Sequence, residues 1–268
     1  MSTVGAPGVS RNISASNDPN TPTVTSSLNV TFNGGATGSV TLYGSISSNG
    51  GDVLFEKPVN LASAAPVSTT VDSPNETLPA DPALNRSGNI TFKERVTLMG
   101  NNPVTLSTQS VLDGAQIPIA RGGNIVFEKT LDSADINNPL GLTLNTTGAI
   151  SLNGAPGNFS GAVEFWGNIG ADMKPLRSIA IVGPSSIELG NPNGTTGGLE
   201  QTVTLRNNGG TLLSFDAPGA LRPALKLNNT NTVLNATGFG AAGVSDFTVS
   251  EFDIVKGDAA AVGTTDSN

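Results

Sequence analysis

The sequence predicts an all-β protein, specifically a right-handed parallel β-helix that forms a single elongated β-solenoid domain. Three observations support this prediction. Short segments alternate between apolar and polar residues, a Gly-led motif recurs along the chain, and no segment has helical periodicity. The composition agrees, because 13% of the 268 residues are charged and 4% are aromatic, against about 25% charged residues in an ordinary globular domain.

The recurring motif occurs at residues 51–57, 88–94 and 123–129. It consists of Gly, then Asp or Asn, then Ile or Val, any residue, Phe and a pair of opposite charges. Successive coils of a solenoid place like residues on like residues. We therefore expect a set of structural repeat residues to stack in register: Gly51, Phe55, Gly88, Asn89, Phe92, Gly123, Asn124 and Phe127.

The motif predicts a role for each of its positions. The Phe side chains would form a column inside the solenoid, with coils about 4.8 Å apart. The Asn side chains would form a ladder between coils at a turn, and the charge pairs would form an exposed stripe that fixes the register. Spacings of about 17 and 35 residues are interpreted as one and two coils.

Short apolar pairs with one residue between them predict further strands. They are bounded by Gly, Asn, Pro or Ser, which favour tight turns. Strands this short are less typical of a sandwich or a barrel. The pairs are Val40/Leu42, Val96/Leu98, Val104/Leu106, Leu142/Leu144, Ile150/Leu152, Ile179/Ile181, Ile187/Leu189, Val203/Leu205, Leu225/Leu227 and Phe247/Val249.

The chain divides into three parts by composition. Residues 1–24 are rich in Ser, Thr, Asn and Pro and are predicted to be a flexible arm or cap. Residues 25–255 form the solenoid, with a Pro-containing loop insertion at about 62–87, and residues 256–268 form a flexible tail. Because solenoid ends expose strand edges, end-to-end self-association is expected as one mode of assembly.

Composition also bears on chemistry. The chain has no Cys and no His, which removes thiolate and imidazole catalysis and the usual zinc and copper ligands. We predict that the protein is not an enzyme, with no catalytic, cofactor-binding or metal-binding residues and no cofactor. The net charge of −8 without a basic stripe argues against nucleic acid. No apolar run reaches the roughly 20 residues of a membrane helix, so membrane insertion is not expected.

Carbohydrate chemistry is the alternative, because parallel β-helices also carry polysaccharide-cleaving sites built from clustered acids. Candidate acids are Asp132 and Asp135, and the group Asp246, Glu251 and Asp253. Without His and with few basic neighbours, they are better interpreted as solvated turn carboxylates. Trp166 and Tyr43, the only Trp and Tyr, are candidates for stacking on sugar rings, although a packing role in the core or a turn is expected for both.

About one hundred residues resemble a known family. The segments GNITF at 88–92, VTLST at 104–108, GGNIVFEKTLDS at 122–133, LGLTLNTTGAISLNGAPG at 140–157 and FWGNIGADMKPLRSIAIVGPSSIEL at 165–189 resemble filamentous haemagglutinin-like and related large repeat adhesins of bacterial surfaces. The resemblance implies a right-handed β-helix, secretion and an adhesive or fibre-forming role. It supplies no catalytic residues.

The sequence therefore predicts a structural or adhesive extracellular protein, a rigid β-solenoid spacer or fibre subunit that is secreted or lies on a bacterial cell surface. Its expected partners are other copies of itself and a surface glycan or host cell-surface ligand. The alternative is a carbohydrate-binding or polysaccharide-cleaving β-helix protein.

Overall fold

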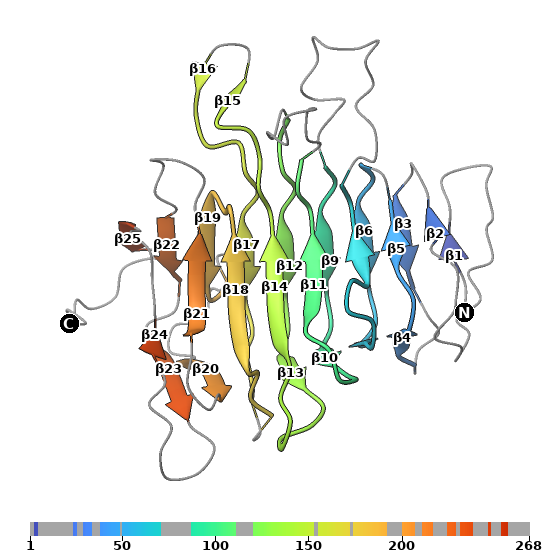
Figure 1. The fold of residues 1–268 in the computed structure, drawn as a ribbon, viewed down its shortest axis with the longest axis vertical. Coiled ribbons are helices and arrows are strands. Elements are labelled where there is room, and N and C mark those ends of the chain that lie inside the picture. The colour runs from blue at the N-terminus through green and yellow to red at the C-terminus, as the bar shows by residue number, and fades with distance from the viewer. Residues whose placement is uncertain are drawn as a thin grey trace.

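The computed structural model shows an all-β chain whose strands stack side by side as a parallel β-solenoid (Figure 1). The part of the chain that it describes contains strands and no helix. The described residues are 3–4, 24–25, 29–33, 38–48, 50–70, 87–110, 120–152, 155–171, 174–191, 200–206, 211–216, 224–228, 231–237, 246–247 and 253–256.

Three sheets form the walls of the solenoid, and we name them A, B and C. Sheet A has the strand order β1 (Thr3–Val4), β3 (Val30–Phe32), β6 (Val53–Phe55), β9 (Ile90–Phe92), β12 (Ile125–Phe127), β17 (Val163–Phe165), β19 (Ser186–Leu189), β22 (Ala224–Leu227) and β25 (Asp253–Lys256). Sheet B has the order β2 (Val24–Thr25), β5 (Ile46–Ser47), β8 (Val67–Ser68), β11 (Val104–Ser107), β14 (Gly141–Asn145), β18 (Ser178–Val182), β21 (Thr211–Asp216) and β24 (Asp246–Phe247).

Sheet C is the third wall. It contains β4 (Val40–Leu42), β7 (Val59–Leu61), β10 (Val96–Leu98) and β13 (Leu131–Ser133). The parallel pair β20 (Glu200–Arg206) and β23 (Asn231–Thr237) continues this wall, because Ile169 bridges both Leu131 and Val203.

Each coil passes through sheets A, C and B in turn, as β9, β10 and β11 show. The Asn124 amide bonds to Asn89, 35 residues earlier, directly across the neighbouring strands β9 and β12. A spacing of 35 residues is therefore one coil, and the interpretation of 17 and 35 residues as one and two coils is wrong. The reason is that a coil holds three strands and corners of variable length. Asn29 and Asp52, 23 residues apart, also lie in neighbouring coils.

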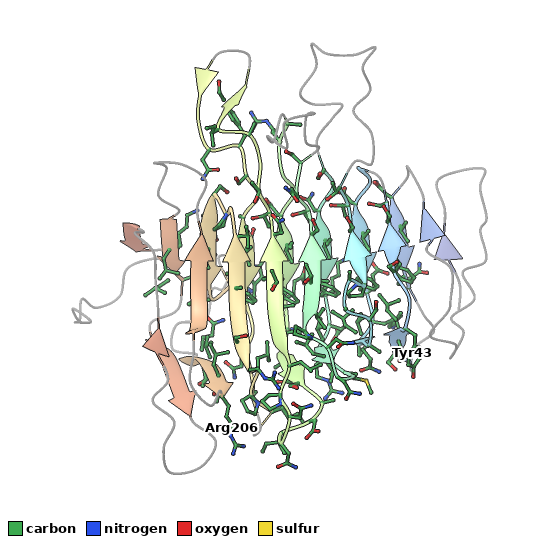
Figure 2. All side chains as sticks on the ribbon, viewed as in Figure 1. Tyr43 and Arg206 are labelled. Carbon is green, nitrogen blue, oxygen red and sulfur yellow. The ribbon has the colours of Figure 1, made fainter. Side chains whose placement is uncertain are left out.

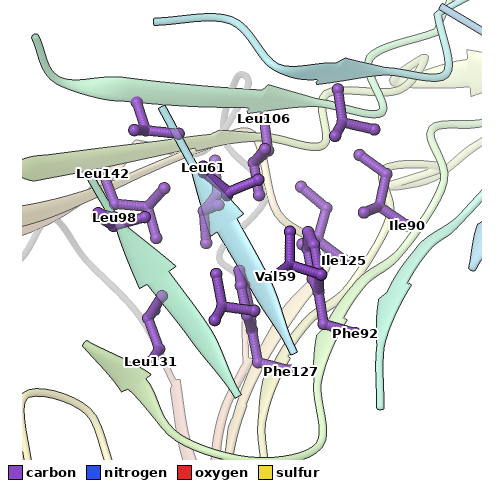
Figure 3. Close-up of a cluster of buried hydrophobic side chains, with 14 of the residues drawn as sticks. Val59, Leu61, Ile90, Phe92, Leu98, Leu106, Ile125, Phe127, Leu131 and Leu142 are labelled. Atoms are coloured by element: carbon purple, nitrogen blue, oxygen red, sulfur yellow. The ribbon is translucent and has the colours of Figure 1, made fainter. Parts of the chain in front are cut away.

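The strands alternate between buried and half-exposed residues, as expected when every second side chain points into the interior of the solenoid. In β3, β4, β6, β7, β9, β10, β12 and β17 the first and third residues are buried and the middle one is half-exposed. The buried residues of all three sheets make one hydrophobic core, and Figure 3 shows part of it around Leu98, Phe92 and Phe127. Stability thus comes from one continuous apolar interior.

Several elements differ from the sequence prediction. Ile150 is 48% exposed, and Leu152 lies in the antiparallel hairpin β15 (Ser151–Leu152) and β16 (Ala155–Pro156), so this pair is not a coil strand. Strand β8 lies inside the range 62–87, which was interpreted as an insertion, so the coil continues at least to Thr70. Within residues 1–24, β1 pairs antiparallel with β3. Residues 257–268 lie outside the described residues.

Candidate functional site

The Phe residues of the motif form a continuous column inside sheet A. Ring centroids lie 4.9 Å apart for Phe55 and Phe92 and 5.0 Å apart for Phe92 and Phe127, with nearly parallel planes. The column extends to Phe32 at 4.7 Å from Phe55 and to Phe165 at 5.3 Å from Phe127. The motif search missed these two ends because neither follows a Gly-Asn or Gly-Asp pair, although both end a Val-x-Phe triplet.

A ladder of Asx side chains runs beside the column. Asn89 Oδ1 accepts a hydrogen bond from the Asn124 backbone N–H at 2.8 Å, and Asn124 Oδ1 accepts one from the Ala162 N–H at 2.8 Å. Asp52 Oδ1 accepts from both the backbone N–H and the side-chain Nδ2 of Asn89, at 2.7 and 3.1 Å. The ladder therefore runs mainly from side-chain oxygen to the main-chain N–H of the next coil, which fixes the register.

Truncating one rung tests the ladder. Asn89→Ala removes the acceptor of the Asn124 N–H, so we expect the free energy of unfolding to fall by about 1 kcal/mol, the net value of one hydrogen bond. Urea denaturation followed by circular dichroism measures it. Asp52→Asn is the matched control, since it keeps an acceptor oxygen at the same position. Equal stability of the two variants would contradict the ladder.

Buried hydroxyl groups close the corner where sheet B leads into sheet A. Ser48, Thr69 and Thr108 are fully buried. Their hydroxyls donate to the carbonyl oxygens of Gly51, Gly88 and Gly123, which follow 3, 19 and 15 residues later. The same contact thus forms whatever the length of the intervening chain, so this corner accepts insertions without loss of register. The sequence marks this corner by an apolar residue followed by Ser and then Ser or Thr.

The charged pairs of the motif face outward. Strand register places Glu56, Lys93 and Glu128 at the same position in three successive coils, so their signs alternate. Lys93 Nζ lies 3.6 Å from Glu56 Oε1, and both side chains are more than one-third exposed. An exposed pair of this kind stabilises by about 0–1 kcal/mol, and its main physical effect is to favour one register over its neighbours.

The sequence predicted that Asp132 is a solvated turn carboxylate, and this prediction is wrong. It lies in β13 and is only 5% exposed. Lys174 and the Ala171 N–H from the next coil interact with it, together with Arg95 and Thr130. Among the described residues, none donates a hydrogen bond to its Oδ1. Burial raises the pKa of Asp132 above its ordinary value of 3.8, and the interactions with Lys174, Ala171, Arg95 and Thr130 lower it less than burial raises it.

This raised pKa predicts a pH dependence. The folded state holds the Asp132 proton more tightly than the unfolded state, so its contribution to stability is full below pH 3.8 and is lost as the pH rises through the folded pKa. Asp132→Asn should therefore be more stable than the parent at pH 7 by about 1 kcal/mol, the lower range for a buried unsatisfied group. The gain should shrink toward pH 3, as measured by urea denaturation at several pH values.

Asp135→Asn provides the control for this pH dependence. Asp135 is exposed, and its Oδ1 accepts a hydrogen bond from the Asn137 N–H at 2.8 Å, which an Asn can also accept. Its replacement should leave the free energy of unfolding at pH 7 unchanged. A gain for Asp135→Asn as large as that for Asp132→Asn would contradict the assignment. The side chains of the other acidic group, Asp246, Glu251 and Asp253, lie outside the described residues.

The two candidate sugar-stacking residues lie in different places. Tyr43 is 40% exposed and Figure 2 places it at the lower edge of the solenoid in that view, so it does not lie in the core. Trp166 follows β17 and is partly buried on the outer side of sheet A. Its Nε1 donates to Glu164 Oε2 at 3.0 Å. The outer face of sheet A at Trp166 is therefore the place where aromatic and acidic side chains meet.

Comparisons with protein families, curated proteins and solved structures give no match to this chain. In the described part of the chain, no helix has the length and apolar character needed to cross a membrane. The same residues hold no group of three or more acidic side chains placed to bind a metal ion. The functional argument therefore depends on the geometry of the coils and their outer faces.

Proposed function

We propose that this chain is a structural or adhesive extracellular protein, a rigid β-solenoid spacer or fibre segment on a bacterial surface, related to filamentous haemagglutinin-like adhesins. The observation that carries the proposal is the unbroken column of five stacked Phe rings, from Phe32 to Phe165. A core that repeats along one axis resists bending, because any tilt of one coil separates ring faces and backbone ladders together.

The dimensions suit a spacer. Nine strands of sheet A at about 4.8 Å each give a stack on the order of 40 Å along the solenoid axis. The strands of the walls run across this stacking axis (Figure 1). The corner closed by Ser48, Thr69 and Thr108 lets insertions vary without disturbing the rod. This arrangement separates a constant support from variable surface loops.

Self-association is part of the proposal, and the two ends differ. Sheet A ends at β25, whose pairing with β22 is parallel, whereas at the other end β1 pairs antiparallel with β3. An antiparallel edge interrupts the parallel stacking that a further coil would need. In sheet B the outermost pairs are parallel at both ends, so the antiparallel edge distinguishes the two ends in sheet A alone. Contact between copies is favoured at the β24 and β25 end, where both sheets end in parallel pairs.

Electron microscopy of the purified chain tests the proposal. We expect stiff, protease-resistant rods, and light scattering at rising protein concentration should show growth by end contacts. Compact particles that trypsin digests at every basic residue would contradict the rigid rod, and a monodisperse monomer at high concentration would remove the self-association. Release of reducing ends from a panel of polysaccharides would overturn the non-enzymatic assignment.

A further inference from the structure

Six residues from three successive coils meet on the outer face of sheet A, at strands β17, β19 and β22. Strand register places Glu164 directly opposite Glu188, and Glu188 directly opposite Lys226. The residues that follow these strands form a second row, because Trp166, Gly190 and Asn228 donate equivalent backbone bonds to Phe127, Phe165 and Leu189. The two rows are adjacent, so they make one patch.

The side chains of this patch are held by one another. Trp166 Nε1 donates to Glu164 Oε2 at 3.0 Å. Lys226 Nζ donates to Glu188 Oε1 at 2.7 Å, with 41% of the Lys226 side chain and 13% of the Glu188 side chain exposed. Asn228 Nδ2 donates to the Gly190 carbonyl at 3.0 Å and lies 3.5 Å from Glu188 Oε2. The side chains of the patch are therefore held in place. Lys226, Trp166 and Glu164 are partly exposed, whereas Gly190 and Asn228 are buried.

Two glutamates directly opposite each other are unfavourable for folding. Like charges on neighbouring strands destabilise a sheet, and in earlier coils of this same sheet the signs of Glu56, Lys93 and Glu128 alternate. Burial has the largest effect and raises the pKa of Glu164; the hydrogen bond from Trp166 lowers it, the nearby Glu188 raises it, and Lys226 lowers it. A local arrangement that costs stability is typical of a binding site rather than of a supporting wall.

The indole of Trp166 has an unusual neighbour. At its position the preceding coil carries Glu128, and the following coil carries Gly190, which has no side chain. Gly190 has φ of +93°, a conformation that favours glycine. The next coil therefore places no side chain beside the indole at this position, and the carboxylates of Glu164 and Glu188 lie in the adjacent row.

We propose that Trp166, Glu164 and Glu188 bind a neutral pyranose unit of an oligosaccharide. The indole packs against the apolar face of the sugar ring, and the carboxylates accept hydrogen bonds from its hydroxyls. Asn228 is buried and acts as a positioning residue, because its amide contacts Gly190 and Glu188. The two carboxylates repel an acidic sugar. Lys226, at 2.7 Å from Glu188, disfavours a divalent cation between them. The site rests on the proposed function in one respect: an adhesive surface protein suggests carbohydrate as the class of ligand.

Trp166 is the only Trp of the chain, so its fluorescence reports on this site alone. We expect saturable changes in emission when the full chain is titrated with cellotetraose, maltotetraose or chitotetraose up to millimolar concentrations, for at least one of the three. Glu188→Gln and Glu164→Gln should weaken that binding about tenfold, as expected for loss of a hydrogen bond to a charged group. Glu56→Gln, which alters a glutamate also paired with a Lys of the next coil, should not change it.

The outcomes separate the site from the proposed function. No saturable change with any of the three neutral tetrasaccharides, in protein whose circular dichroism is native, would overturn the site while leaving rods in electron micrographs unaffected. Tighter binding of a uronic-acid tetrasaccharide than of the neutral ones would overturn the neutral class. Binding that Glu56→Gln weakens as much as Glu188→Gln would place the ligand elsewhere. Calorimetry with Trp166→Ala, expected to abolish binding, gives a readout independent of fluorescence.

Discussion

Phe92→Ala is expected to lower the free energy of unfolding by about 4 kcal/mol, which lies within the range for replacing a buried Phe by Ala. Phe92 is fully buried and stacks on two rings, Phe55 at 4.9 Å and Phe127 at 5.0 Å. Removing it opens a cavity between them. Neighbouring coils cannot collapse into this space, because backbone ladders on all three walls fix their separation.

Two control variants divide this effect into its parts. Phe92→Leu keeps most of the volume but loses both ring contacts, so a loss of about 1.5 kcal/mol is expected. Tyr43→Ala changes an aromatic residue that is 40% exposed, and its effect should stay within about 0.5 kcal/mol. Urea denaturation gives the totals. If Phe92→Ala costs no more than Tyr43→Ala, the column does not support the solenoid.

Each coil of a solenoid is stabilised by its nearest neighbours, so the position along the chain at which stability is lost is informative as well. Hydrogen exchange should accelerate first in β6, β9 and β12, whose backbone amides flank Phe92. Strands distant from the substitution, such as β18 and β19, should retain most of their protection. A uniform acceleration along the chain would show instead that the solenoid unfolds as one cooperative unit.

The strands and the parallel solenoid could be predicted from sequence, because each depends on local patterns. Period-two apolar pairs bounded by turn residues identify strands, and like motifs imply like stacking. The length of a coil could not be predicted, since the corners vary. Thr69 and Gly88 meet across 19 residues where Ser48 and Gly51 meet across 3, so motif spacing mixes the coil with its insertions.

Other features could not be predicted from the sequence, because they depend on residues far apart in the chain. The alternation in β13 predicts that Asp132 faces solvent, and it does face outward, but the segment near Ala171 and Lys174 in the next coil covers it. The pairing of Glu164 with Glu188 requires the register of two strands joined by a short coil. Ile150 and Leu152 have the same pattern as a coil strand, yet they belong to an antiparallel hairpin beside the coils.

Gly123→Ala is expected to lower the free energy of unfolding by about 3 kcal/mol, the upper range for overpacking. A Cβ at this position would lie 1.9 Å from the Gly88 carbonyl oxygen and 2.6 Å from its carbon. Both are backbone atoms of the neighbouring coil, so no side chain can rotate away. The coils must separate at this corner, which lengthens the 2.9 Å bond from Gly123 N–H to the Thr108 carbonyl.

Gly38→Ala is the matched control, because a Cβ there meets nothing within 4 Å. It should be neutral or stabilising by about 0.5 kcal/mol, since alanine reduces the freedom of the unfolded chain. The two substitutions add the same methyl group, but Gly123→Ala should lower the melting temperature, whereas Gly38→Ala should leave it unchanged or raise it slightly. The glycine column of Gly51, Gly88, Gly123 and Gly161 would then be required by the close approach of successive coils. Equal melting temperatures for the two variants would mean that the coils tolerate a wider spacing at this corner.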